Sequence, residues 1–166
     1  MERKNVTAIV LAAGLGTRMV SDIPKVLHKL GSYTILDRVL KGLNKAGILD
    51  IIVVVGNKKE QIKLYCKNYN VRFVVQKKLL GSADAVLSVL NAKIPIKDNI
   101  LITCADAPLI SSNTFINLVN KQKKTNAFCS LLTCKVENPF SYGRIIKNEK
   151  NEILEIIEQK DLIKNQ

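Results

Sequence analysis

The chain begins with an apolar run that leads directly into a glycine-containing loop carrying two cations. Residues 6–12 are almost entirely apolar, which predicts a buried β-strand. Gly14 and Gly16 follow, and then Arg18 and Lys25. Glycine lets a backbone approach a ligand closely and adopt the positive φ values that turn N–H groups toward an anion. Because the cations add charge for hydrogen bonds to phosphate, this segment predicts a phosphate-binding loop.

The loop matches neither of the two common phosphate-binding patterns. A P-loop has Gly-Lys-Ser/Thr at the start of a helix, and no glycine here is followed by that pair. The dinucleotide-binding pattern needs a glycine three residues after Gly16, where this chain has Met19. A strand-to-helix turn that uses glycine for steric reasons alone is the alternative, and the nearby cations argue against it.

Apolar runs and helical patterns alternate along most of the chain. Strands are expected at residues 6–12, 51–55, 71–75, 99–104 and 127–134, and helices at 34–46, 57–67, 82–91 and 111–120. The strand segments are mostly continuously apolar, which suits a mostly parallel sheet covered on both faces. This alternation predicts a doubly wound, three-layer α/β/α fold.

Smaller signals mark where the elements begin and end. Ser82 and either Ser111 or Ser112 are candidate helix N-caps, and Gly47 is placed to end the first helix. Residues 144–157 predict a β-hairpin with a polar turn.

Two polar residues follow predicted strands directly, at the carboxyl ends where such sheets bind ligands. Asp106 follows strand 99–104, and its carboxylate could hold Mg²⁺, a cation that prefers carboxylate and phosphate oxygens. A helix-capping or turn aspartate is the alternative. Gln76 follows strand 71–75, and its amide offers both a donor and an acceptor to the edge of a pyrimidine base.

The chain of 166 residues is strongly basic, with a formal net charge of +12. Nucleic-acid binding is the alternative that this charge raises, but the lysines are scattered and aromatic residues make up only 5%. We therefore expect no nucleic-acid partner, and the positive charge favours a triphosphate substrate. The sequence shows no signal peptide and no apolar run long enough to span a bilayer, which predicts a cytoplasmic protein without a membrane partner.

The four cysteines lack C-x-x-C spacing, and His28 is the single histidine of the sequence. A zinc site or a disulfide framework is therefore not expected. Cys104, Cys129 and Cys134 lie in apolar runs and are expected to be small buried residues. A Ser-His-Asp triad would depend on His28 alone, which we expect instead to order its loop or to cap the next segment.

Five motifs, in order along the chain, resemble those of the sugar-1-phosphate nucleotidyltransferases. They are LAAGLGTRM at 11–19 with SDIPKVLH at 21–28, Gln76 with LGSADA at 80–85, Asp106 with PLI at 108–110, YGRI at 142–145, and IIEQKD at 156–161. Within that family, the chain is most similar to the uridylyltransferase domain of the bifunctional N-acetylglucosamine-1-phosphate uridyltransferases. The resemblance covers nearly the whole chain, and five ordered motifs are more specific than any one of them.

The resemblance implies a nucleotidyltransferase fold and transfer of UMP from UTP to N-acetylglucosamine-1-phosphate, giving UDP-N-acetylglucosamine and pyrophosphate. It implies Mg²⁺ bound by Asp106 and catalytic roles for Arg18 and Lys25 on the triphosphate. Gly143 and Glu158 would contact the sugar. The nucleotide would be bound by Leu11, Ala12, Ala13, Gly14, Gly16, Lys25, Gln76, Gly81 and Ser82.

The chain departs from the family pattern near the base and the metal. Where the relatives usually have Gly-Thr-Gly-His-Ala, this chain has Gly-Ser-Ala-Asp-Ala at 81–85. Ala105 and Cys104 stand where the family usually has a glycine and an aromatic residue before Asp106. A related transferase for another nucleoside triphosphate or another sugar-1-phosphate is therefore the alternative.

The family domain also continues for several dozen residues past the point that corresponds to Gln166. We therefore expect residues 1–166 to form a nucleotidyltransferase domain that is incomplete at its C-terminal end, without the acetyltransferase β-helix domain of the bifunctional enzymes. A non-catalytic nucleotide-binding fragment is a further alternative. If the domain is incomplete, its possible protein partners are further copies of this chain, in a homo-oligomer, or a complementing C-terminal segment.

Overall fold

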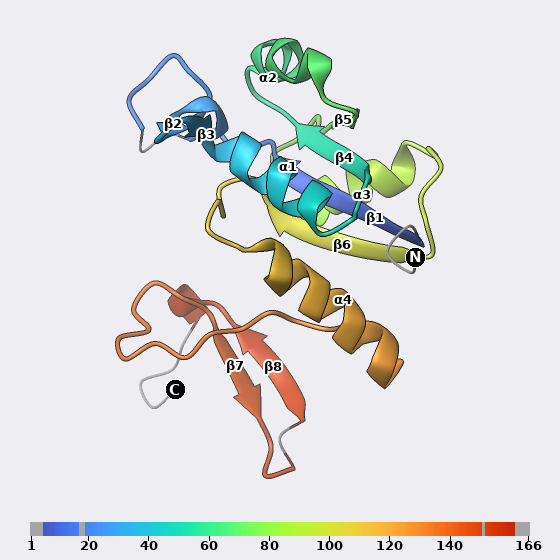
Figure 1. Cartoon of the computed structure of the whole chain (residues 1–166). Coiled ribbons are helices and arrows are strands. Elements are labelled where there is room, and N and C mark those ends of the chain that lie inside the picture. Colours follow the sequence, from blue (N-terminus) through green and yellow to red (C-terminus); the bar gives the residue numbers. More distant parts are fainter. Residues whose placement is uncertain (1–4, 17–18, 151, 162–166) are drawn as a thin grey trace. The chain divides into compact units, whose positions relative to one another are not determined.

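The first of two compact units contains a parallel four-stranded sheet. The structure, a computed structural model, describes residues 5–16, 19–150 and 152–161. They divide into a first unit that ends at Ser130 and a second unit that begins at Leu131. In the first unit the strand order is β5-β4-β1-β6 (Figure 1). The strands are β1 (Val6–Ala12), β4 (Asp50–Val55), β5 (Arg72–Val75) and β6 (Asn99–Cys104).

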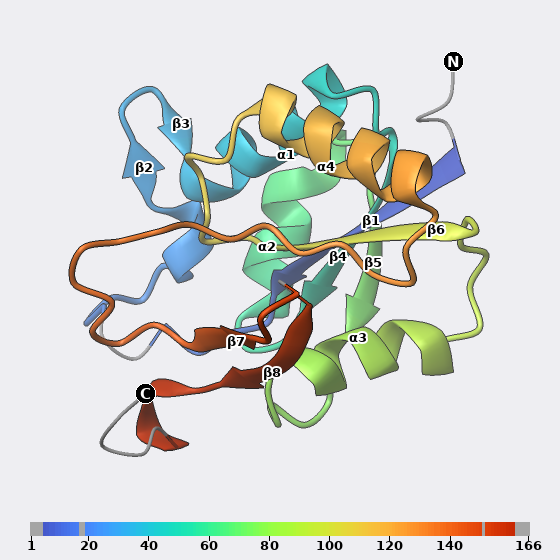
Figure 2. The ribbon, with the colours of Figure 1, turned by 90° about the horizontal axis from the view of Figure 1, so that it is seen from below.

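Helices cover both faces of this sheet. They are α1 (Ile35–Lys45), α2 (Lys59–Tyr65), α3 (Ser82–Asn91) and α4 (Ser112–Thr125), with the 3-10 turns η2 (Lys25–Leu27) and η3 (Cys66–Asn68) and the short strands β2 (Lys29–Leu30) and β3 (Tyr33–Thr34). Side chains of α1, α2 and α4 share one hydrophobic core with the sheet, whereas α3 packs on the opposite face (Figure 2). The predicted three-layer α/β/α fold is therefore confirmed. No helix in the described part of the chain is long and apolar enough to cross a membrane.

Burial explains why the central strands are continuously apolar. In β1, Ala8 and Val10 belong to the core shared with α1, and Ile9 belongs to the core shared with α3. A strand buried on both faces offers few positions to polar side chains. The edge strand β6 differs, because Leu101 is buried while the neighbouring Ile102 is 51% exposed. The central strands, rather than the edge strands, therefore account for the continuous pattern.

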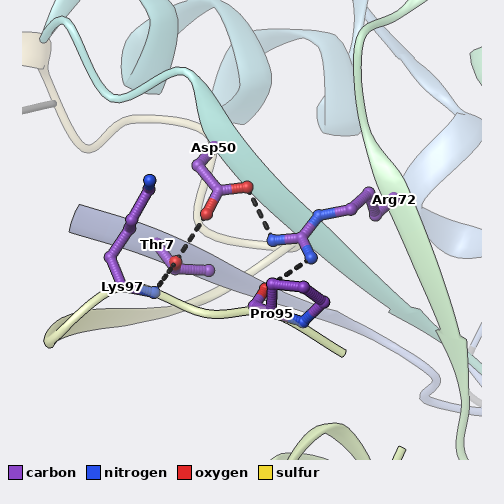
Figure 3. A network of polar contacts seen from close by, with 5 residues as sticks. All are labelled: Thr7, Asp50, Arg72, Pro95 and Lys97. Carbon is purple, nitrogen blue, oxygen red and sulfur yellow. Dashed lines mark hydrogen bonds and ion pairs between the residues drawn. The ribbon is translucent and has the colours of Figure 1, made fainter. Parts of the chain in front are cut away.

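A polar network joins the amino ends of β1, β4 and β5 (Figure 3). The buried hydroxyl of Thr7 donates to Asp50 Oδ2 at 2.6 Å and accepts from the backbone N–H of Lys97 at 2.8 Å. Arg72 donates to Asp50 Oδ1 and to the carbonyl oxygen of Pro95, each at 2.6 Å. The network therefore ties three strands to the loop between α3 and β6, at the end of the sheet opposite the strands' carboxyl ends.

Helix α1 begins at a capping box built on a buried aspartate. Thr34 Oγ1 accepts from the Asp37 N–H, and the Asp37 carboxylate accepts from the Thr34 N–H, each at 3.0 Å. The same carboxylate accepts from the hydroxyls of Tyr65 and Tyr69. Burial raises the pKa of Asp37, but the hydrogen bonds from Tyr65, Tyr69 and Thr34 outweigh burial and hold that pKa below its ordinary value.

Two predicted helix boundaries are confirmed, and one predicted N-cap is wrong. Gly47 follows α1 with a positive φ of 77°, and Ser111 caps α4 by accepting from the Thr114 N–H at 3.1 Å. Ser82 is instead the first helical residue of α3, and Gly81 occupies the cap position with a φ of 114°. Residues with side chains rarely adopt that φ, so the turn into the helix falls on the glycine.

The second unit contains the predicted antiparallel hairpin. Strand β7 (Arg144–Lys147) pairs with β8 (Ile153–Ile157), and the 3-10 turn η4 (Gln159–Asp161) follows.

The strand predicted at residues 127–134 is wrong, because this segment has no regular secondary structure. A strand needs a neighbouring strand to pair with its backbone, and no strand among the described residues pairs with this segment. The carbonyl oxygen of Ala127 accepts instead from the side chain of Gln122. The apolar side chain of Phe128 is fully exposed, so its hydrophobicity reflects no burial in a sheet.

Candidate functional site

A cavity of about 440 Å³ opens at the carboxyl ends of the strands of the first unit. Its lining comes mainly from the loops that follow β1, β4, β5 and β6. The predicted site residues in this lining are Leu11, Ala12, Ala13, Gly14, Gly16, Lys25, Gln76, Gly81, Ser82 and Asp106. The structure thus brings the residues predicted for the nucleotide and the metal around one cavity. Arg18, predicted as catalytic, lies outside the described residues.

The cavity lies where the order of the strands reverses. The chain passes from β1 outward to β4 and β5 and then returns to β6 on the other side of β1. Open α/β sheets bind their ligands at such a point, outside the carboxyl ends of the strands. The loops after β1 and β6 therefore occupy the position that the fold provides for a ligand.

Gly16 shapes the loop after β1. Its φ is 63°, and the Met19 N–H donates to its carbonyl oxygen at 2.9 Å. A Cβ at this position would lie 3.1 Å from the Cβ of Lys25. Glycine is therefore needed both for the turn and for the close approach of Lys25. Gly14 shows neither constraint, because its φ is not positive and its Cβ position has open space around it.

Lys25 and Asp106 form an ion pair between the loops that follow β1 and β6. Lys25 is the first residue of η2 and follows Pro24, whose φ of −50° fits the restriction imposed by the proline ring. The Ala105 N–H donates to the Leu11 carbonyl at 3.0 Å, which continues the pairing of β1 and β6 and positions Asp106. The Lys25 ammonium then donates to Asp106 Oδ2 at 2.8 Å. A cation suited to phosphate and a carboxylate suited to a divalent metal therefore lie in direct contact.

Gln76 extends β5 and buries its side chain beside the start of α3. Its backbone N–H donates to the Val55 carbonyl at 2.8 Å, and the residue is 5% exposed. Its side-chain Nε2 donates to the Gly81 carbonyl at 3.1 Å and to Asp84 Oδ2 at 2.7 Å. Asp84 was not predicted as a site residue, although it lies in the motif where the chain departs from the family pattern.

Two lining residues that the sequence analysis missed follow β4. They are Asn57 and Lys58. The backbone of Lys58 adopts a left-handed conformation with a φ of 52°. Its side-chain Nζ donates to the Ser21 carbonyl oxygen at 3.1 Å and lies 4.0 Å from Asp22 Oδ1. Their position directly after the apolar run 51–55 was the signal that could have found them, because it is the same signal that identified Gln76 and Asp106.

The predicted burial of three cysteines is wrong. Cys104, Cys129 and Cys134 are exposed, whereas Cys66 is buried. Side chains alternate along the edge strand β6, and Cys104 shares the exposed face with Ile102. Partial burial nevertheless raises the pKa of the Cys104 thiol. Cys129 and Cys134 lie in the segment that forms no strand and therefore gain no cover from a sheet.

Asp106 is the one carboxylate that the described residues contribute to the lining of the cavity. Among the described residues, no three His, Cys, Asp or Glu side chains gather closely enough to hold a metal ion. Asp106 alone fits a hard cation such as Mg²⁺, which typically takes one or two protein carboxylates together with phosphate and water oxygens. His28 takes no part in such a group, and its Nε2 lies 3.3 Å from the Ile23 carbonyl within the loop.

The two residues predicted to contact a sugar lie together in the second unit. A Cβ on Gly143 would lie 3.3 Å from the Ile157 carbonyl oxygen and 3.8 Å from Glu158 Oε2. The hairpin therefore places the Gly143 backbone beside the Glu158 carboxylate, and their sugar-binding role stays a prediction.

A parallel sheet with a glycine-shaped loop, a lysine and a carboxylate at its switch point defines a nucleotide-binding α/β domain. Comparison with known families gives the particular class. Residues 8–156 match the MobA-like NTP transferase domain, so the chain belongs to this family of nucleotidyltransferases.

Curated relatives confirm the resemblance found in the sequence. The chain is 37% identical over 155 residues to the bifunctional protein GlmU of Syntrophomonas wolfei, which covers 93% of this chain and 34% of that protein. It is 39% identical over 157 residues to the bifunctional protein GlmU of Lactobacillus johnsonii, covering 95% of this chain and 34% of that protein. The chain thus spans about a third of the length of the curated relatives it matches.

Solved structures agree on the fold. A nucleotidyl transferase from Methanothermobacter thermautotroptrophicus superposes with a TM-score of 0.60 at 25% identity, over 69% of this chain and 56% of that one. Rv0371C from Mycobacterium tuberculosis, in complex with manganese, gives a TM-score of 0.57 at 22% identity, over 70% of this chain and 58% of that one.

Proposed function

We propose that this chain transfers UMP from UTP to N-acetylglucosamine-1-phosphate, releasing pyrophosphate and forming UDP-N-acetylglucosamine with the help of Mg²⁺. The observation that carries the proposal is the meeting of Gly16, Lys25, Gln76 and Asp106 around one cavity at the switch point of the sheet. The similarity to the bifunctional protein GlmU supports the choice of substrates.

The proposed reaction joins two anions, so the site must screen charge and align the reactants. An oxygen of the sugar phosphate attacks the α-phosphorus of UTP, and the bond from that phosphorus to the β-phosphate oxygen breaks to release pyrophosphate. Lys25 would bind the triphosphate and stabilise the negative charge that grows on it. The loop at Gly16 would hold the phosphates close to the backbone, so that most of the catalysis is positioning.

Asp106 is the residue proposed to hold the metal. The cation, when bound, would neutralise charge on the phosphates and orient them toward the acceptor. Because Lys25 forms an ion pair with Asp106 in the free protein, binding of phosphates by Lys25 would free the Asp106 carboxylate to bind the metal. The manganese complex of the structural neighbour Rv0371C is compatible with a divalent cation in this fold.

The second unit would supply the sugar contacts. The Gly143 backbone and the Glu158 carboxylate lie beside each other in the hairpin, which suits the acetamido group and a hydroxyl of one sugar. Arg18 is proposed to assist Lys25 on the triphosphate.

The test is pyrophosphate release by the chain with UTP and N-acetylglucosamine-1-phosphate, in the presence and absence of Mg²⁺. Separate reactions replace UTP by CTP, GTP or dTTP, and the sugar by other sugar-1-phosphates. Metal-dependent release with UTP and this sugar supports the proposal. Preference for another pair would assign a related transferase, and nucleotide binding without turnover would indicate a binding fragment.

A further inference from the structure

Asp84 has no part in the proposed reaction, yet its carboxylate is bonded to the residue proposed to contact the base. Asp84 Oδ2 accepts from Gln76 Nε2 at 2.7 Å, and the Gly81 carbonyl accepts from the same nitrogen at 3.1 Å. Asp84 lies in the first turn of α3, so a rigid helix carries the carboxylate. The Gln76 side chain is buried, which leaves it little freedom to leave these partners.

The two partners determine which way the Gln76 amide points. A carbonyl oxygen and a carboxylate oxygen only accept hydrogen bonds, and the amide group of glutamine has two donor hydrogens on its nitrogen. The nitrogen must therefore face Gly81 and Asp84. Reversing the amide would place its oxygen against a carboxylate oxygen and leave a buried acceptor without a donor, which is costly. Asp84 thus determines the orientation of the Gln76 amide because its carboxylate can only accept a hydrogen bond.

The fixed orientation leaves the side-chain oxygen of Gln76 for a ligand. No hydrogen bond among the described residues uses Oε1, and no side-chain polar atom in that part of the chain is both buried and unpartnered. Gln76 also lines the cavity. The oxygen is therefore not fully buried, and it is the acceptor that this amide can offer to a ligand in the cavity, while both donor hydrogens are already used.

We propose that Asp84 is a positioning residue that sets base selectivity, because it makes Gln76 accept a hydrogen bond from the base instead of donating one. This inference rests on the proposed function. A base with an N–H on its ring edge, such as the N3–H of uracil, satisfies Oε1. The ring N3 of cytosine is itself an acceptor and meets the oxygen unfavourably, so UTP is selected over CTP.

The wild-type test compares four nucleotides, namely UTP, 3-methyl-UTP, 5-methyl-UTP and CTP, by calorimetry with Mg²⁺ present. UTP has the N3–H, 3-methyl-UTP lacks it, and 5-methyl-UTP keeps it while adding a methyl group of the same size. We expect UTP and 5-methyl-UTP to bind at least about tenfold more tightly than 3-methyl-UTP and CTP, because losing one buried hydrogen bond has roughly that effect.

The variant Asp84→Asn tests the role of the carboxylate. An asparagine can donate as well as accept, so one of the two groups that face the Gln76 nitrogen no longer requires a donor, and reversing the amide costs less free energy. We expect the ratio of UTP to CTP affinity, and of UTP to 3-methyl-UTP affinity, to fall severalfold toward one. Ser88→Ala is the matched control, because Ser88 Oγ donates to the Asp84 backbone carbonyl at 2.9 Å and does not touch the carboxylate. This control should keep the wild-type ratios.

Other outcomes overturn the inference in distinguishable ways. If Asp84→Asn weakens all nucleotides by the same factor, Asp84 has only a structural role while the proposed function stands. Equal wild-type affinity for UTP and 3-methyl-UTP shows that Gln76 does not accept from N3–H. If the folded wild-type chain binds none of these nucleotides, the proposed function fails together with the inference.

Discussion

Lys25 Nζ lies 2.8 Å from Asp106 Oδ2, and the two residues are separated by 81 positions in the chain. Each belongs to a loop at the carboxyl end of a strand, after β1 for Lys25 and after β6 for Asp106. In the free protein, the cation proposed for phosphate therefore neutralises the carboxylate proposed for the metal. Under the proposed function, this pairing would make binding of nucleotide and binding of metal interdependent.

The first prediction concerns Lys25→Gln, which removes the partner of Asp106. Binding of Mn²⁺ in the absence of nucleotide should strengthen, but only by up to about fivefold, because partly exposed ion pairs contribute about 1 kcal/mol or less. Any turnover should fall by about a hundredfold or more, the usual effect of losing one preorganised electrostatic group. Electron paramagnetic resonance measures free Mn²⁺. Lys58→Gln removes the same charge from the same cavity without touching Asp106, and an equal gain in Mn²⁺ affinity there would contradict the prediction.

The second prediction concerns Asp106→Asn. A neutral amide is a poor ligand for a hard cation, so the strengthening of UTP binding by Mg²⁺ should fall by at least about tenfold. The thermal midpoint should barely change, because Asp106 is exposed. Calorimetric titrations measure the UTP affinity with and without Mg²⁺, and a thermal melt measures the midpoint. Asp22→Asn, at an exposed carboxylate 4.0 Å from Lys58, is the control. An unchanged Mg²⁺ effect in Asp106→Asn would show that the metal binds elsewhere.

The third prediction concerns the pH dependence of stability. Because the folded-state pKa of Asp37 is lowered, its ionised form stabilises the fold above its unfolded pKa of about 3.9, and this stabilisation is lost as the pH falls through the folded pKa. Asp37→Asn should lower the free energy of unfolding by about 1–3 kcal/mol at neutral pH. Urea denaturation should show this difference shrinking below about pH 4. Asp98→Asn, at an exposed site, is the control, and a difference independent of pH would rule out the ionised carboxylate as its source.

The fourth prediction concerns Thr7→Val in the network of Figure 3. Valine has nearly the same shape, but it leaves Asp50 Oδ2 without its donor and the Lys97 N–H without its acceptor. The free energy of unfolding should fall by about 1–3 kcal/mol, since Thr7 is fully buried and both of its hydrogen bonds are partly buried. UTP affinity should not change, because the network lies at the amino ends of the strands. Thr125→Val, at an exposed hydroxyl, is the control, and a loss of UTP affinity in Thr7→Val would connect the network to the cavity.

The fifth prediction contrasts two glycines. A Cβ on Gly56 would lie 2.8 Å from the Ala13 carbonyl oxygen and 2.9 Å from Leu79 Cδ2, whereas a Cβ on Gly14 meets nothing within 4 Å. Gly56→Ala should therefore lower the free energy of unfolding by about 1–3 kcal/mol through overpacking. Gly14→Ala should leave it nearly unchanged. Equal denaturation midpoints for the two variants would show that the loops after β1 and β5 yield to the added methyl group.

The sequence by itself determined the secondary structure of the sheet and the position along the chain of most residues of the candidate site. The apolar runs that became β1 and β4 report local burial, which the order of residues encodes directly, and those that became β5 and β6 were long enough to predict strands. In a parallel sheet the carboxyl ends of neighbouring strands meet at one edge. Residues such as Gln76 and Asp106, which follow strands, could therefore be assigned to one site without coordinates.

Only the tertiary structure decided which of these residues touch. The Lys25–Asp106 ion pair and the hydrogen bond from Gln76 to Asp84 depend on distances between separate elements, and no local sequence pattern contains such distances. The same reason explains the errors at 127–134 and at Cys104. An apolar run becomes a strand, and an apolar side chain becomes buried, only when another element supplies the partner or the cover, and the fold supplies neither there.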